Sequence, residues 1–164
     1  MEKAVLDALN DQIRLELSSG YAYLSMSAQF EAEAFDGFAR WMRLQANEEL
    51  EHAMRLFEYV NQRGGRVLLQ AVGKPPSDFG RPRDAFGKAL EHEQAVTASI
   101  HRLYALADQH SDLATMRALD WFVTEQVEEE ESAQRAVDLL TRAGDNDAAL
   151  LMLDRQFGQR SGEE

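Results

Sequence analysis

An acid and an imidazole interrupt the apolar face of one amphipathic segment. Residues 46–60 have the 3.6-residue period of a helix, and Glu49 and His52 stand where that period places core residues. Their spacing puts both side chains on one helical face. Polar residues interrupt three further apolar stripes at similar depth: Glu16, Glu93, and the pair Gln126 and Glu129. We therefore expect these side chains to meet inside the molecule.

Bound metal would explain four carboxylates in one core. Each buried carboxylate costs several kcal/mol in desolvation and the four repel one another, so apolar residues would be more stable there. Two divalent cations balance the four charges. The chain has no cysteine, so the ligands must be oxygen and imidazole nitrogen, which leaves iron, manganese and zinc open. A lone Glu-x-x-His pair is more often a solvated face, but the coincidence on four helices favours a dinuclear site.

Further acids flank the expected core ligands. Glu48, Glu125 and Glu128 are adjacent in sequence to core positions, and with Glu129 they could form a second, more open carboxylate site. The alternative is that the run from Glu128 to Glu131 is a solvated charged surface.

One tyrosine and three histidines near the apolar stripes need not be metal ligands. Tyr23 follows Glu16 by two turns and either packs in the core or donates a hydrogen bond to a ligand. His92, His101 and His110 fall outside the core phase, so we expect them at the surface.

The elements that position these residues are predicted to be five helices in a single domain spanning 1–164. Their expected ranges are 2–34, 37–63, 83–109, 112–143 and 146–158, with Asp36 capping the second helix, Asp112 the fourth, and Pro82 in the first turn of the third. The segment 65–82 lacks helical period. It is long enough to run the length of the bundle, since extended chain spans up to about 3.5 Å per residue. The second and third helices can therefore be parallel, while short connections make the other sequential pairs antiparallel.

Composition excludes several classes of function. A chain of 164 residues suits one domain, and a net charge of −12 argues against nucleic acid or anionic membranes as partners. No apolar run has the length of a membrane span, and the first residues lack the pattern of a signal peptide. We expect a cytoplasmic protein that binds cations.

Five segments resemble the non-haem ferritins of bacteria and archaea in order and spacing: LNDQIRLELSSGYAYLSMSAQF, EELEHAMRLFEYVNQRGGRV, KPPS, EHEQAVT and DWFVTEQVEEE. The resemblance implies an all-α, ferritin-like four-helix bundle with a long crossover loop and a short fifth helix. It also implies a homo-oligomeric octahedral cage of 24 subunits. Such a cage oxidises Fe(II) with dioxygen or peroxide and stores ferric mineral inside.

The resemblance also implies roles for single residues. Glu16, Glu49 and His52 match the first iron site, and Glu49 matches the carboxylate that bridges to a second site completed by Glu93 and Glu129. Five further residues match less central positions: Gln126 beside the second site, Tyr23 near the centre, and Glu48, Glu125 and Glu128 at a third iron site.

Departures from a sister family argue against haem. Bacterioferritins are similar but carry a second Glu-x-x-His and a haem-ligating methionine, where this chain has Gln126-x-x-Glu129 and Leu50. Ser18 and Gly20 depart from the usual pattern near Glu16, so packing there is expected to differ.

Three alternatives are weaker. One is a cage subunit that only nucleates mineral, against which the full ligand set argues. Another is a DNA-protecting mini-ferritin, which the acidic charge disfavours. The third is a peroxide-reducing di-iron protein, which would usually have a second Glu-x-x-His and a cysteine-based electron donor. This chain has neither.

Overall fold

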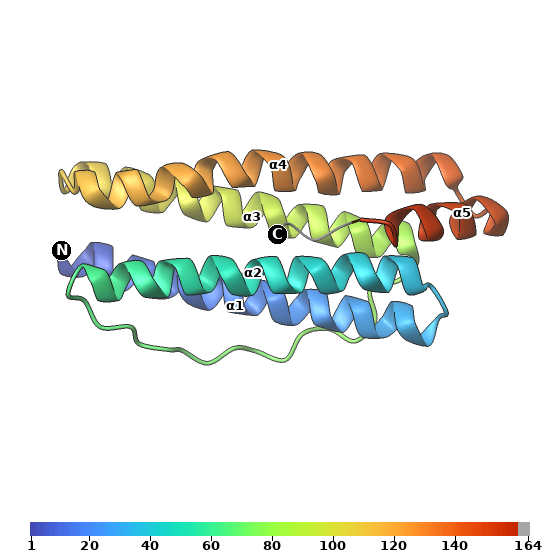
Figure 1. Ribbon diagram of the computed structural model, residues 1–164, viewed down its shortest axis with the longest axis horizontal. Coiled ribbons are helices and arrows are strands. Elements are labelled where there is room, and N and C mark those ends of the chain that lie inside the picture. The colour runs from blue at the N-terminus through green and yellow to red at the C-terminus, as the bar shows by residue number, and fades with distance from the viewer. Residues whose placement is uncertain (161–164) are drawn as a thin grey trace.

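The computed structural model describes residues 1–160, and five α-helices account for most of them (Figure 1). The helices are α1 (Lys3–Ala32), α2 (Asp36–Gln62), α3 (Pro82–Gln109), α4 (Leu113–Ala143) and α5 (Asp147–Phe157). The described part of the chain contains no β-strand. The predicted all-α class is confirmed, and each helix begins and ends within two residues of its expected bound.

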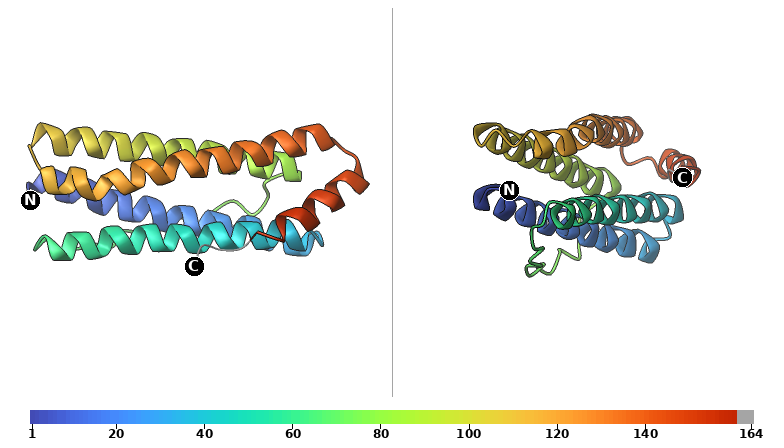
Figure 2. Two further views of the ribbon diagram at one scale, coloured as in Figure 1. Left: turned by 45° about the horizontal axis from the view of Figure 1, so that its top comes forward. Right: turned by 60° about the vertical axis from the view of Figure 1, so that its left-hand side comes forward.

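The four long helices form two antiparallel pairs stacked on each other. α1 packs mainly against α2, and α3 against α4. Figures 1 and 2 show the two pairs as layers, with the segment between α2 and α3 running back along the bundle. As a result α2 and α3 are parallel, as predicted. None of the helices within residues 1–160 combines the length and apolar character needed to cross a lipid bilayer.

The long connection is attached to α1 along its course. The side chain of Asn10 accepts a hydrogen bond from the backbone N–H of Leu68 at 2.8 Å, and Ser25 Oγ donates to the carbonyl of Pro76 at 2.6 Å. Further along, Gln29 Oε1 accepts from the N–H of Phe79 at 2.8 Å. These contacts satisfy backbone groups that a loop without its own ladder would leave unpaired.

Two of the three predicted helix starts are correct. Pro82 is the first residue of α3, and the carboxylate of Asp112 accepts a hydrogen bond from the N–H of Thr115 at 3.1 Å. The prediction for Asp36 is wrong, because Asp36 is already helical and the preceding Phe35 makes no side-chain cap. Asp154 of α5 takes over this task, since its Oδ1 accepts from the N–H of Phe38 at 2.8 Å.

The apolar core consists of two clusters with a polar layer between them. One contains Phe30, Phe38 and Phe86 towards the α5 end, and the other contains Leu9 and Ile100 towards the opposite end. Burying each of these side chains contributes roughly 1.5–3 kcal/mol. The apolar clusters therefore stabilise the four helices on both sides of the layer in which the polar core residues lie.

Spacing of three and four residues predicts one inward-facing stripe on each long helix: Leu6 to Phe30 on α1, Phe38 to Tyr59 on α2, Ala89 to Ala107 on α3 and Leu119 to Leu140 on α4. These stripes are buried almost throughout. The exceptions are Leu6 and Tyr59, which are half-buried, whereas their neighbours Val5 and Val60 are fully buried. Both exceptions lie near a helix end. A stripe drawn with heptad spacing drifts by about 20° per heptad on a straight helix, so the error accumulates there.

Candidate metal centre

Three side chains from two helices converge at the first half of the site. Glu16 of α1 and Glu49 and His52 of α2 each offer a ligand atom, and these atoms lie within 4.8 Å of one another. Their side chains are buried, at 0%, 2% and 4% exposure. The turn of α1 that precedes Glu16 and the turn of α2 that follows His52 both pack in the apolar cluster around Leu9. This packing fixes the positions of Glu16 and His52 along the bundle axis.

Each of these three residues has one buried polar atom without a hydrogen-bond partner: Glu16 Oε2, Glu49 Oε2 and His52 Nδ1. Buried polar groups in folded proteins are nearly always satisfied, so such atoms need an explanation. His52 Nδ1 lies 3.7 Å from Glu49 Oε2. Two carboxylate oxygens and one imidazole nitrogen fit a divalent first-row metal ion.

The second half of the site is held by neutral hydrogen-bond donors. The hydroxyl of Tyr23 donates to Glu93 Oε1, and the amide of Gln126 lies 3.4 Å from Glu93 Oε2. Gln45 donates to Glu129 Oε2 at 2.8 Å. Among the described residues, Glu129 also belongs to a second group of ligand atoms within 4.8 Å, together with His52 and Glu125. Glu93 belongs to neither group.

Burial dominates the electrostatics of the carboxyl groups. It raises the pKa of Glu16, and together with the charges of Glu93 and Glu16 it raises the pKa of Glu49 well above its usual value. Burial also raises the pKa of Glu93 to about 7 and that of Glu129 to about 8. Without a cation these acids therefore retain protons near neutral pH, and a bound metal ion would displace them.

The imidazole and the phenol are also perturbed. Burial, with a smaller effect from Arg55, lowers the pKa of His52 to about 4, so its ring is neutral and can act as a metal ligand. Burial and the charge of Glu93 raise the pKa of Tyr23 well above its ordinary value. Tyr23 therefore stays a hydrogen-bond donor to Glu93.

Sequence reasoning missed residues that orient the ligands. Gln12 is buried and donates to Glu16 Oε1 at 2.8 Å, while its own oxygen accepts from Ser99 Oγ at 2.6 Å. Gln12 precedes Glu16 by four residues, and this spacing could have revealed the pair. Gln45 donates a hydrogen bond to Glu129 on another helix, and residue spacing within one helix cannot reveal such a pair.

The flanking acids line a neighbouring pocket of about 180 Å³. It is formed by Glu48, Glu125, Glu128, Glu129, Ser132 and Arg160. Glu48 and Glu125 are half-buried, and Glu128 is exposed. The structure thus brings the expected residues together, but it adds Arg160, whose Nη2 donates to both oxygens of Glu48 at 3.0 and 3.1 Å.

The prediction for His92 is wrong. His101 and His110 are exposed as predicted, but His92 is half-buried, hydrogen-bonded to Ser19 and in edge contact with Tyr23 at 6.1 Å between ring centroids. Burial lowers its pKa. His92 adjoins Glu93, so the inward side of α3 includes it although it lies off the apolar stripe.

Gly20 lets α1 approach α2 beside the ligands. A Cβ at this position would lie 3.1 Å from the carbonyl oxygen of Ala46 and 3.5 Å from Glu49 Cβ. The glycine that departs from the family pattern therefore allows a close helix contact next to Glu49.

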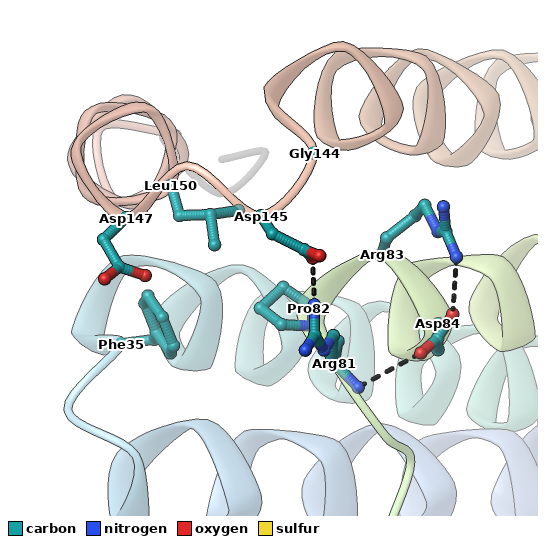
Figure 3. Close-up of a pocket in the computed structure, with 9 residues that line it drawn as sticks. All are labelled: Phe35, Arg81, Pro82, Arg83, Asp84, Gly144, Asp145, Asp147 and Leu150. Carbon is teal, nitrogen blue, oxygen red and sulfur yellow. Dashed lines mark hydrogen bonds and ion pairs between the residues drawn. The ribbon is translucent and has the colours of Figure 1, made fainter.

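A separate pocket of about 680 Å³ lies at the α5 end of the molecule (Figure 3). Both arginines of this pocket pair with acids that also line it: Arg81 with Asp145, and Arg83 with Asp84 at 3.5 Å. None of the expected ligands lines it. The chemistry therefore belongs to the mid-bundle site.

The helical bundle and its central carboxylates define a class of protein, the ferritin-like domains. The family model described as "Ferritin-like domain" matches residues 6–143. The chain belongs to this family.

The relatives narrow the class further. The chain is 37% identical over 164 residues to a bacterial non-heme ferritin of Staphylococcus aureus, covering 100% of this chain and 99% of that protein. It is 42% identical over 154 residues to one from Bacteroides fragilis, covering 94% and 96%. An open pore ferritin of Archaeoglobus fulgidus matches in structure with a TM-score of 0.97 and 46% identity, covering 98% and 99%. The predicted membership of the non-haem bacterial and archaeal ferritins is thus confirmed.

Proposed function

We propose that this protein stores iron and oxidises it on the way in. In this proposal it is a ferroxidase that converts Fe(II) to Fe(III) with dioxygen or peroxide, and the ferric product is stored as mineral inside a hollow cage. The main support is the convergence of three unpartnered buried ligand atoms on Glu16, Glu49 and His52. A passive mineral surface would not need buried carboxylates whose desolvation destabilises the fold.

Each residue has a proposed task. Glu16, Glu49 and His52 bind one ferrous ion, and Glu93 and Glu129 bind a second, with Glu49 bridging the two. Gln126 and Tyr23 hold Glu93 through the hydrogen bonds described above. Carboxylates are hard anionic ligands and stabilise Fe(III) more than Fe(II), which lowers the free energy of oxidation.

The electron count requires a pair of metal sites. Each Fe²⁺ loses one electron, so two neighbouring ions supply the two electrons that, with two protons, convert dioxygen to hydrogen peroxide. With hydrogen peroxide as oxidant, the same two electrons and two protons cleave the O–O bond to give water. Carboxyl groups with raised pKa values release protons when metal binds, which provides a local source.

Self-association completes the proposal. Several large apolar side chains are exposed on the single subunit, among them Leu69 at 69% and Met152 at 74%. Contacts with other copies of the chain would remove these side chains from water. We propose a homo-oligomeric octahedral cage of 24 subunits. A cytoplasmic location stays a prediction of the sequence.

Haem is not part of the proposed function. Leu50 stands where the sister family has a methionine ligand, and its side chain is 51% exposed. Gln126 replaces the acid of the second Glu-x-x-His motif, and its amide faces Glu93 and Thr97.

The deciding experiment is stopped-flow absorbance of metal-free protein mixed with a few ferrous ions per subunit in air. The wild type should give a fast ferric signal, and Glu49→Ala should slow the initial rate by at least about 100-fold, because Glu49 contributes to both iron positions. Glu58→Ala, at an exposed position of the same helix, is the matched control. Wild-type rates equal to those of iron in buffer would leave only a mineral container without a catalytic centre.

A further inference from the structure

The chain returns to α2 after the end of α5, and Arg160 lies against three residues of that helix. Its Nη2 donates to both carboxylate oxygens of Glu48, at 3.0 and 3.1 Å. Its Nη1 donates to Gln45 Oε1, and its guanidinium carbon lies 5.1 Å from the ring centroid of Trp41. The Arg160 side chain is only 26% exposed. A guanidinium with charge-assisted and cation–π contacts is held in a defined place.

The contact with Gln45 extends to a proposed iron ligand. Gln45 is 1% exposed, and its Nε2 donates to Glu129 Oε2 at 2.8 Å. A guanidinium can only donate hydrogen bonds, so Arg160 fixes the amide oxygen of Gln45 on its own side. The amide nitrogen must then face Glu129. Arg160 thus orients a core carboxylate through one intervening side chain.

The charge of Arg160 lies in the pocket that it shares with four acids, Glu48, Glu125, Glu128 and Glu129. A metal ion at this pocket would use the oxygens of Glu48 that Arg160 now contacts. The metal ion and the guanidinium repel each other and need the same acceptors.

We propose that Arg160 is a built-in competitor for the cation site formed by Glu48, Glu125, Glu128 and Glu129. It occupies Glu48 and holds Glu129 through Gln45, so a metal ion enters this pocket only by displacing the guanidinium. The C-terminal segment thereby sets the metal affinity of the pocket next to the oxidation centre. This inference rests on the proposed use of these carboxylates as iron ligands.

The competing explanation is structural. Arg160 could serve only to attach the C-terminal segment to α2 through its contacts with Glu48 and Trp41. The two explanations differ in what the loss of Arg160 changes. A structural attachment affects the melting temperature and leaves metal affinity unchanged, whereas a competitor affects metal affinity.

The test uses Tb³⁺, a hard cation that does not change oxidation state with ferritin oxidants, on the full-length assembled protein. Luminescence sensitised by tryptophan reports binding near Trp41 or Trp121, and calorimetric titration with Zn²⁺ gives an independent stoichiometry. Arg160→Gln should tighten the weaker class of Tb³⁺ sites roughly five- to tenfold, as expected for removal of one partly exposed ion pair. Arg155→Gln makes the same charge change at an exposed position of α5 and should leave the affinity unchanged.

Arg160→Lys separates charge from geometry. Lysine can pair with Glu48 but cannot also donate to Gln45 in the fork geometry of arginine, so its effect should lie between those of wild type and Arg160→Gln. If Arg160→Gln does not assemble, Arg160→Lys decides alone: tighter Tb³⁺ binding supports the proposal, and unchanged binding rejects it.

The outcomes separate this inference from the proposed function. Unchanged or weaker Tb³⁺ affinity in Arg160→Gln overturns the competitor role, including the case in which only the melting temperature falls. The fast oxidation lost in Glu49→Ala would still stand in that case. Wild-type protein that binds neither Tb³⁺ nor Zn²⁺ would overturn both.

Discussion

At the scale of single residues, the buried carboxyl groups of the site hold protons that a bound metal ion would replace. Burial raises the pKa values of Glu93 to about 7 and Glu129 to about 8 from 4.5, so the folded protein binds more protons than the unfolded chain. Their stabilising contribution is complete below pH 4.5 and is lost as the pH rises through 7 and 8. His52 has the opposite sign, because its pKa falls from 6.5 to about 4 and its contribution is lost as the pH falls through that range.

We predict that metal-free protein loses stability between pH 6.5 and 8.5. Each carboxyl contributes a slope of at most about 1.4 kcal/mol per pH unit in that window, and His52 no longer opposes it. Zn²⁺ should raise the melting temperature and flatten its pH dependence, since it replaces the protons. Calorimetric melting at a series of pH values checks this.

Two variants locate the origin of this slope. Glu129→Gln should reduce it, whereas Glu58→Gln at an exposed position should not. A melting temperature of metal-free protein that stays level or rises from pH 6.5 to 8.5 would contradict the burial argument.

At the scale of elements, α5 and the start of α2 dock backbone against backbone. A Cβ on Gly37 would lie 1.7 Å from the carbonyl oxygen of Asp154, a distance no side chain can adopt. The carboxylate of Asp154 in turn accepts from the N–H of Phe38 and supplies the cap that α2 lacks. Phe157 packs on Phe38 and Phe86, each at 5.4 Å between ring centroids. The position of α5, and hence of Arg160, depends on this contact.

We predict that Gly37→Ala displaces α5 and lowers the free energy of unfolding by about 1–3 kcal/mol, the usual effect of overpacking. Gly87→Ala is the matched control, because Gly87 lies in α3 with no atom within 4 Å of the place its new methyl group would take, and alanine favours the helix by up to about 1 kcal/mol. Urea denaturation measures both changes. Limited proteolysis should cut the C-terminal segment faster in Gly37→Ala only, and equal effects of the two variants would argue against this docking contact.

At the scale of the whole molecule, large apolar side chains are exposed on the long connection, on α5 and on the outward faces of the bundle helices. Leu68 and Leu69 lie on the long connection, at 54% and 69% exposure, and Tyr21 and Leu24 lie on α1, the helix to which that connection is attached. Leu151 and Met152 on α5 are also exposed. Contacts between copies of the chain would remove these surfaces from water.

We predict that Leu69→Glu shifts the protein from a large assembly towards smaller species, because it places a charge where an apolar contact is proposed. Ala98→Glu adds the same charge at an exposed position of α3 without removing a large apolar side chain. Sedimentation velocity distinguishes the two. Assemblies of equal size for wild type and Leu69→Glu would remove Leu69 from the interface.

The helices, their order and most of the inward-facing residues could be predicted from the amino-acid sequence. These features follow from local periodicity and from turn residues such as Pro82 and Asp112, which act on their own neighbourhood. Convergence of Glu16, Glu49 and His52 could be predicted because interruptions at equal depth on adjacent helices must face each other. The parallel course of α2 and α3 followed from the length of one loop.

The contacts between particular atoms of different helices could not be predicted in this way. The cap that Asp154 provides to α2, the hydrogen bond from Gln45 to Glu129 and the contact of Arg160 with Glu48 join residues more than 80 positions apart. Such contacts depend on the rotation of each helix about its axis and on where α5 docks. Periodicity reports which face of a helix is apolar, but it does not report which side chain of another element will occupy the space opposite that face.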